Sequence, residues 1–544
     1  MKTNKMICIL LSLVFVLGVM AGCSDSSATT DPEVSAEVAA IYAAAEERKN
    51  AILNSPTTIV KADEYIMGET YSGTAYYVSN NGSDENDGLS PDTPFATVDV
   101  FNDIELQYGD AIFFERGSMW RTVQLPWSIR GTEGITISAY GEGAKPKLYA
   151  SCENGSGAEK WSLAFENNSG KKVWVYHRDM TEVGGIICNN DIIIKRDVAW
   201  WDGSKYYALN ELIPSIKLYD ATTMLPDMYC FPALDYTVVF NRTRDTGDRL
   251  FWNWNEQMGK LEYATGKLFL RCDAGNPGEL YDSIEFIQPY PFVDGCAPHT
   301  VFDNLNVCFS TIGLAVYDSG IIQNCEIGWS GGEVQGYITQ YDQDDVRTTL
   351  NYKSYGRCGG CGGCGGSENI IRNNYIHHSY QEGTGMETEI GEPSMTGNII
   401  QGNLIENCNQ AILVCNWDME VDLSHIFRDC LIENNMVLHT GEENMLNYAW
   451  EVDASANSLS LQGGPCANEN FIIRNNIFAF AEGALVSIDT FSEEYSRIFS
   501  GNTYIQNKGN TGIKLHNLGI GVALTQENVQ KYLGDESAII ISPN

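Results

Sequence analysis

The stretch IIRNNYI at Ile370–Ile376 decides the fold, because similar stretches follow it along the chain. They are IIQGNLI at Ile399–Ile405, LIENNMV at Leu431–Val437, IIRNNIF at Ile472–Phe478 and, more loosely, IFSGNTY at Ile498–Tyr504. The fifth position is Asn each time, and successive copies are 29, 32, 41 and 26 residues apart. A motif of fixed length that recurs with intervening segments of variable length is typical of a solenoid. The alternation of apolar and polar residues within the motif, with a period of two, indicates β-strands. Asn suits a left-handed bend and can hydrogen-bond from coil to coil. We therefore predict a β-solenoid.

The composition agrees with one long repetitive domain. The chain has 544 residues, and repeats grow by stacking rather than by adding domains. It carries 34 Lys and Arg against 71 Asp and Glu, a formal net charge of −37. The negative electrostatic potential of such a protein repels polyanions, so we expect no nucleic-acid partner.

The N-terminus has the pattern of an export signal. Lys2 and Lys5 precede the apolar run Met6–Met20, and the small residues before Cys23 form a cleavage box. The pattern is similar to a bacterial lipoprotein signal, which implies that Cys23 is lipidated. We therefore expect a protein of the bacterial cell envelope, extracytoplasmic and held at the membrane by this lipid. Ordinary secretion with an incidental Cys23 is the alternative.

A second stretch, TAYYVSNNGSDENDGLSPDTPFATVDVFNDIELQYGDAIFFERGSMWR at Thr74–Arg121, resembles the opening of secreted proteins of the pectin-lyase-like group. The resemblance continues through Ile135–Leu148 and Gly266–Pro277, and spans roughly Tyr76 to Tyr504. It implies an all-β fold, a single-stranded right-handed parallel β-helix with loop insertions. This fold hosts lyases, hydrolases, esterases and tailspikes, so the resemblance specifies the fold better than the substrate.

The expected organisation follows from these features. Residues 1–22 are the signal, and residues 23–70 are a tether with a helical segment near Glu33–Asn50. Residues 71–520 form the β-helix, and residues 521–544 form a C-terminal cap. Two insertions interrupt the coils, an irregular β-rich one at about 185–290 and a loop at 328–368. We expect a monomer.

In the family the Asn bend joins the second and third strands of a coil, and the substrate groove lies on the first strand. The first strands here would directly precede each apolar phrase. They are Gly313–Asp318, Gly385–Ile390, Ala411–Asp418, Asn447–Asp453 and Ala484–Asp489.

Alternation in GMETEI turns Met386 inward and leaves Glu387 and Glu389 outward. Coils stack at about 4.8 Å and alternate residues on a strand lie roughly 6.6 Å apart. These two acids and the strand-end acids could therefore share one surface; the latter are Asp318, Asp418 and Asp453. Such carboxylates can cleave a glycosidic bond as acid and base, or hold Ca²⁺ for a uronan lyase. A merely solvated acidic face is the third interpretation.

The distribution of Lys and Arg along the chain favours acid–base cleavage of a glycosidic bond. A lyase normally needs Lys or Arg as base, yet no Lys lies between Lys353 and Lys508. Arg372 and Arg474 share one repeat position away from the groove, so only Arg357 is well placed. We therefore predict a glycoside hydrolase acting on a neutral or weakly charged polysaccharide, with no cofactor. The alternatives are a Ca²⁺-dependent lyase and a non-catalytic glycan-binding protein.

Further residues could assist. His378 or His377 could aid proton transfer or bind substrate, although a surface His is often inert. Flat aromatic faces could stack on sugars, with core packing as the alternative; the candidates are Trp329, Trp417 and Trp450.

The cysteine run Cys358, Cys361 and Cys364 resembles half an iron–sulfur signature without its fourth Cys. We interpret it as a Gly-rich lip with at most one disulfide. Coil cysteines such as Cys325, Cys408 and Cys430 are expected to fill small buried sites, and we predict no metal site.

Overall fold

The structure is a computed structural model. It describes residues 36–61, 70–166, 170, 172–181, 183, 185–197, 200–201, 206–207, 228–230, 265–288, 292–293, 295–310, 312–331, 333–341, 347–355, 360–361, 366–388, 395–416, 426–441, 456–463, 467–491 and 497–543.

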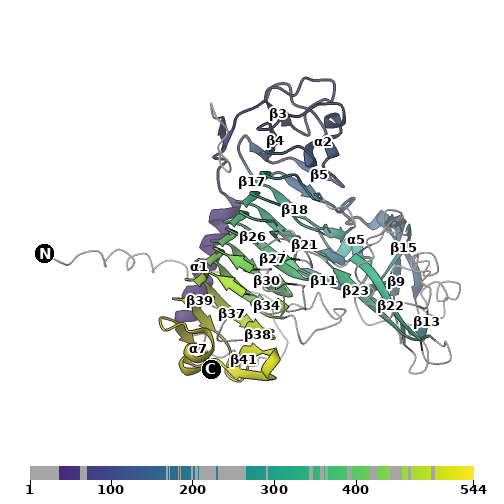
Figure 1. Cartoon of the computed structure of the whole chain (residues 1–544). Helices are drawn as coiled ribbons and strands as arrows, with labels where there is room; N and C mark the ends of the chain where they lie inside the picture. Colours follow the sequence, from purple (N-terminus) through teal and green to yellow (C-terminus); the bar gives the residue numbers. More distant parts are fainter. Residues whose placement is uncertain are drawn as a thin grey trace.

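Three long sheets build the body (Figure 1). The first sheet contains β19 (Ala315–Val316), β24 (Gly360–Cys361), β27 (Glu382–Thr388), β30 (Gln410–Asn416), β34 (Leu459–Gly463), β38 (Ala484–Ile488), β41 (Thr511–Leu515) and β42 (Ile520–Ala523). The second contains β3 (Ala75–Val78), β4 (Ala111–Glu115), β6 (Thr136–Tyr140), β17 (Val301–Asp303), β20 (Ile321–Gln323), β25 (Ile370–Arg372), β28 (Ile399–Gln401), β32 (Leu431–Glu433), β36 (Phe471–Arg474) and β39 (Arg497–Ser500). The third contains β5 (Met119–Arg121), β7 (Lys147–Tyr149), β18 (Asn306–Cys308), β21 (Glu326–Ser330), β26 (Tyr375–Ser379), β29 (Leu404–Glu406), β33 (Met436–Thr440), β37 (Ile477–Ala481), β40 (Thr503–Ile505) and β43 (Ile539–Ile541).

The chain visits these sheets in rotation. It passes from β25 in the second sheet to β26 in the third and β27 in the first, then returns to the second sheet at β28. Neighbouring strands are parallel throughout the second and third sheets, and only the terminal pair β41–β42 of the first sheet is antiparallel. The body is therefore β-helix-like, as the repeats predict.

Apolar side chains from all three sheets meet in a shared core. In the coil of β25 these are Ile371, Ile376 and Met386, all 0% exposed. Because side chains alternate between the faces of a strand, a single inward position per short strand suffices to fill the interior. This explains why the repeated phrase needs only its alternating apolar pairs.

A ladder of buried Asn side chains joins the coils at the bend between the second and third sheets. Asn374, Asn403, Asn435, Asn476 and Asn502 are all 0% exposed, and each accepts at Oδ1 from the backbone N–H of the preceding rung. The ladder begins at the N–H of Cys325 and ends at the carboxylate of Asp535.

The left-handed residue is a different one from the ladder Asn. Positive φ occurs one position earlier, for example 52° at Asn373 and 68° at Gly402. The sequence prediction assigned both roles to one position. In the structure one residue makes the turn and the next carries the hydrogen bonds, which is why these phrases read Asn-Asn or Gly-Asn.

Helix α1 (Ala36–Leu53) lies against the outer face of the third sheet, along one side of the stack (Figure 1). Val38, Ala45 and Ile52 form its buried face and pack with Leu404 and other apolar residues of that sheet. The helix predicted near Glu33–Asn50 is thus present and rests on the body.

Two insertions leave the stack and project to the same side in Figure 1. The larger is a seven-stranded, mostly antiparallel sheet in the order β16-β10-β11-β14-β15-β9-β8. Its strands are β8 (Trp161–Glu166), β9 (Lys172–Thr181), β10 (Gly185–Cys188), β11 (Ile192–Asp197), β14 (Met228–Cys230), β15 (Thr265–Arg271) and β16 (Ile284–Ile287). It begins earlier than the predicted 185 because β8 and β9 belong to it. The smaller is the hairpin β22 (Glu333–Tyr341) and β23 (Arg347–Tyr355).

The remaining described elements are short. They are β1 (Val60–Lys61), β2 (Thr70–Tyr71), η1 (Asp99–Asn102), α2 (Trp127–Arg130), η2 (Ala158–Lys160), β12 (Trp200–Trp201), β13 (Tyr206–Tyr207), α5 (Pro277–Leu280), β31 (Ile426–Arg428), β35 (Ala467–Glu469), η5 (His516–Leu518) and α7 (Gln526–Leu533). Helix α7 begins after Thr525, whose hydroxyl accepts from the Asn528 N–H, and ends at left-handed Gly534.

The segment Asn447–Asp453, expected as a first strand, lies outside the described residues, and β30 pairs with β34 (Leu459–Gly463) in the first sheet. Another prediction is wrong. The Cys-Gly run was expected as a lip, but Gly360–Cys361 is strand β24, paired with β19 and with Met386 of β27. This strand could not be predicted from the sequence, because a glycine-rich segment shows no alternation of polar and apolar residues.

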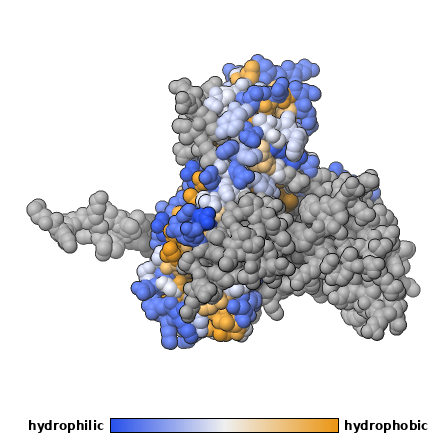
Figure 2. Space-filling view, viewed as in Figure 1, coloured by the Kyte–Doolittle hydropathy of each residue, from blue (hydrophilic) through white to orange (hydrophobic). Residues whose placement is uncertain are grey.

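No helix among the described residues is long and apolar enough to span a membrane. Hydrophilic residues dominate the visible described surface of the N-terminal coils (Figure 2), in keeping with the abundant acidic side chains.

Candidate functional site

The outer face of the first sheet carries Glu387 near the end of β27. Met386 lies in the core at 0% exposed, so alternation turns Glu387 to the opposite face, beside Cys415 of β30. The predicted facing is therefore observed. The predicted exposure is wrong, because Glu387 is 2% exposed and Leu413 and Cys415 are each 1% exposed. A solvated strand face does not describe this carboxyl group.

The other residues predicted for this face lie outside the part of the chain that the structure describes. They are Glu389, Asp418, Arg357, Trp417 and Trp450, together with Asp453 and the lipidation residue Cys23. Asp318 is described and has a structural role. Its carboxylate accepts from the backbone N–H of Ser367, in the turn between the first and second sheets.

Two acids of the first sheet were missed by the sequence analysis. Glu382 opens β27 and is 2% exposed. Asp489 follows β38 and lies 3.7 Å from Nε2 of His516, which is also 3.0 Å from Oγ of Ser487. Both contacts use the same imidazole nitrogen, so the three residues are not arranged as a proton relay. Asp489 ends the strand ALVSID, the position that singled out the other strand-end acids.

The predicted residues Trp329, His377 and His378 come together on the third sheet. The rings of Trp329 and His378 stack with centroids 3.8 Å apart, and the two Nδ1 atoms of the histidines are 2.9 Å apart. Trp329 is 3% exposed and His377 4% exposed, so the expectation that they present open faces to a sugar is wrong. Core packing, the alternative for Trp329, is observed.

Acidic neighbours and burial shape the electrostatics around these residues. Burial raises the pKa of Tyr375 far above its usual value, and Glu406 and Glu326 raise it further. Burial lowers the pKa of Lys145 to about 8, although its ammonium group donates to Ser55 Oγ and Asn304 Oδ1 at 2.9 and 2.7 Å.

The coil cysteines fill small buried sites, as predicted. Cys325, Cys408 and Cys430 are 0–1% exposed. The Sγ of each lies 3.1–3.5 Å from the carbonyl oxygen two residues earlier, which accepts from the thiol.

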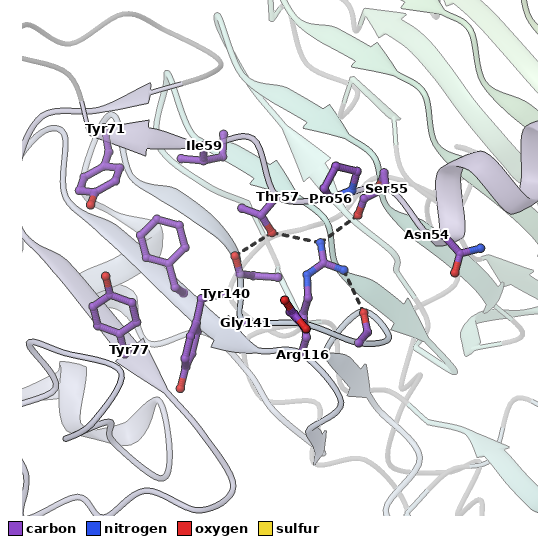
Figure 3. Close-up of a pocket in the computed structure, with 14 residues that line it drawn as sticks. Asn54, Ser55, Pro56, Thr57, Ile59, Tyr71, Tyr77, Arg116, Tyr140 and Gly141 are labelled. Atoms are coloured by element: carbon purple, nitrogen blue, oxygen red, sulfur yellow. Dashed lines mark hydrogen bonds between the residues drawn. The ribbon is translucent and has the colours of Figure 1, made fainter.

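A separate cavity of about 610 Å³ lies beside the outer face of the second sheet, near the N-terminal coils (Figure 3). Tyr77 and Tyr140 line one part of it, and the guanidinium of Arg116 lies at another. Arg116 donates to the Ser55 carbonyl and to the Thr57 hydroxyl, both at 3.0 Å, so it ties the segment after α1 to the body. Burial and Glu115 raise the pKa of Tyr140 to about 12, so this phenol stays protonated at neutral pH.

No known protein-family profile matches this chain. A stretch of 109 residues is 37% identical to the lacto-N-biosidase of Bifidobacterium longum subsp. longum, and it covers 19% of this chain and 7% of that protein. The chain thus matches only a small part of this relative.

Three solved structures are similar at low levels. XylC with xylose has 12% identity and a TM-score of 0.35, over 81% of this chain and 86% of that one. A GH136 lacto-N-biosidase from Eubacterium ramulus has 13% identity and a TM-score of 0.34, over 86% and 68%. Pectate lyase Pel9A has 10% identity and a TM-score of 0.34, over 81% and 77%. At these scores the likenesses carry no argument about activity.

Proposed function

We propose that this protein is an extracytoplasmic glycoside hydrolase built on a single-stranded right-handed parallel β-helix. One observation carries the proposal: alternation in β27 places Glu387 on the outer face of the first sheet, opposite the core residue Met386 and beside Cys415 of β30. Glu is almost never fully buried unless it is paired, so a Glu that is 2% exposed is not a solubilising surface charge.

The chemistry requires a second carboxyl group. Glycoside hydrolases place two carboxyl groups across the scissile bond, one as general acid and the other as base or nucleophile. Glu389 would follow Glu387 on the same face, with the two separated by roughly 6.6 Å along a strand. Asp418 is the other candidate, because β30 leads to it from the strand adjacent to β27. We assign Glu387 to the pair and leave either residue as its partner.

The 37% identity to a lacto-N-biosidase over 109 residues supports hydrolysis and suggests the first substrates to test. We propose glycans that end in lacto-N-biose, held at the cell envelope by an enzyme anchored through lipid on Cys23. A monomer completes the proposal.

The test is product analysis with the purified protein. The panel contains a chromogenic lacto-N-bioside, oligosaccharides ending in lacto-N-biose, neutral polysaccharides and uronans, with added Ca²⁺ and with chelator. We expect saturated sugars to be released irrespective of added Ca²⁺. Unsaturated products that absorb in the ultraviolet would instead establish a lyase, and no product from any glycan would leave a binding protein.

The site is tested by Glu387→Gln, which keeps the size and removes the acid. We expect kcat to fall by about 100-fold or more, the usual range for loss of a general acid or base. Glu469→Gln is the matched control, because this acid lies outside the first sheet, has a side chain 65% exposed and pairs with Arg428. If Glu387→Gln folds and keeps full activity, the assignment is wrong even where hydrolysis is confirmed.

A further inference from the structure

The third sheet brings together three side chains of the kinds that bind zinc. Cys308 ends β18, Glu326 begins β21, and His377 lies in β26. Their Sγ, carboxylate and imidazole ligand atoms all lie within 4.8 Å of one another. Within the described residues this is the one such group of three that contains Cys or His.

The strand register creates the cluster. Cys308 pairs with Gly328, and Gly328 pairs with His377, so the thiol and the imidazole occupy the same position two strands apart. A Cβ at Gly328 would clash with Nε2 and Cε1 of His377. Only glycine therefore allows the imidazole to lie over the middle strand and approach Cys308 and Glu326.

Surrounding groups orient the imidazole and the carboxylate. Nε2 of His377 lies 3.6 Å from Oε1 of Glu326, while its Nδ1 lies 2.9 Å from Nδ1 of His378. The other oxygen of Glu326 accepts from the Asn306 amide, and Tyr375 stacks on the His377 ring. Histidine ligands in metal sites commonly use one nitrogen for the metal and the other for such a supporting hydrogen bond.

Burial and access also fit a bound ion. Cys308 is 3% and His377 4% exposed, whereas the Glu326 side chain is 22% exposed and leaves a path from solvent. Cys308 also packs with Ile187 and Ile287, so the cluster adjoins the place where the inserted sheet contacts the third sheet.

We propose that Cys308, Glu326 and His377 form a zinc site that joins three successive coils. Zinc takes sulfur, nitrogen and oxygen ligands in a tetrahedron, whereas Ca²⁺ takes oxygen. Bonds of about 2.0–2.3 Å place tetrahedral ligands roughly 3.3–3.8 Å apart, so small side-chain rotations suffice to close the cluster. Cys308 binds as the thiolate and releases its proton to solvent, and a water molecule completes the four ligands.

The experiment measures zinc bound by the purified full chain after incubation with Zn²⁺ and removal of the excess. We expect about one zinc per chain, no competition by Ca²⁺, and a higher Tm with zinc. Cobalt substitution should give a thiolate-to-Co²⁺ charge-transfer band in the near ultraviolet. Zinc-free wild-type protein, or bound Co²⁺ without this band, would overturn the proposal.

Variants locate the ion. Cys308→Ser and His377→Gln should each weaken zinc binding at least about tenfold, and Cys308→Ser should abolish the charge-transfer band. Cys430→Ser, which alters another buried thiol outside the cluster, should bind zinc as the wild type does. If the first two variants fail to fold, Glu326→Gln tests the same site at its most exposed ligand. Unchanged affinity in any folded ligand variant would refute the assignment.

Discussion

Replacing Asn435 by Ala should remove one rung of the Asn ladder and destabilise the coils on either side. The Asn435 side chain is 0% exposed. Its Nδ2 donates to the Ile400 carbonyl at 2.9 Å and to Asn476 Oδ1 at 3.0 Å. Its Oδ1 accepts from the backbone N–H and from Nδ2 of Asn403, both at 3.0 Å. Alanine removes all four hydrogen bonds.

The expected cost follows from this count. Four hydrogen bonds at about 0.5–1.5 kcal/mol each give roughly 2–6 kcal/mol, and a buried N–H left without its acceptor favours the upper half. Gln401→Ala, in the preceding coil, is the matched control. It deletes a single hydrogen bond to Glu433 on a half-buried face and should cost about 1 kcal/mol.

The assay is urea unfolding followed by tryptophan fluorescence, with hydrogen exchange of the peptide that contains Asn403. We expect faster exchange in Asn435→Ala than in Gln401→Ala. Asn435→Asp should be intermediate or worse, because a carboxylate accepts but does not donate. Asp535 is tolerated because it is the last rung and only accepts. If Asn435→Ala costs no more than Gln401→Ala, the ladder does not stabilise the stack as argued.

Two further predictions concern cations. Burial lowers the pKa of Lys145 from 10.5 to about 8, so the unfolded chain binds more protons between these values and the free energy of unfolding should rise with pH across this window. Lys145→Met should lose this rise, and equal slopes in urea melts of the two proteins would contradict it. Arg48 of α1 donates to the carbonyl of Asn434 at 2.6 Å. Arg48→Ala should therefore speed proteolytic cleavage around α1 several-fold, whereas Glu47→Ala, at an exposed position, should not.

Local pattern explains most of the fold. The repeated phrase predicts the strands of the second and third sheets, their bend and the ladder, because these depend on alternation and on Asn chemistry within each coil. Strands without such a pattern were missed. Strand β24 consists of Gly360 and Cys361, and β34 (Leu459–Gly463) was not expected either, since pairing with neighbouring coils rather than local composition selects them.

For Glu387, the sequence predicts the side of the sheet on which the side chain lies but not its burial. Alternation correctly turns Glu387 away from the core, because facing is a property of the strand itself. Its burial depends on what covers the sheet, which no local pattern contains. The same applies to Trp329 and His377: the sequence left their surface or packed position open, and both are packed on the third sheet.

The sequence by itself determined the repeating coil, which side chains of its strands point toward the core, and the position of the Asn ladder. Each of these features depends only on the local pattern within one repeat. Only the tertiary structure decided which distant residues meet. Cys308 and His377 share a repeat position, yet their approach depends on Gly328 in the strand between them. The register between neighbouring strands of stacked coils brings Cys308 and His377 together, and this register exists only once the coils are in contact.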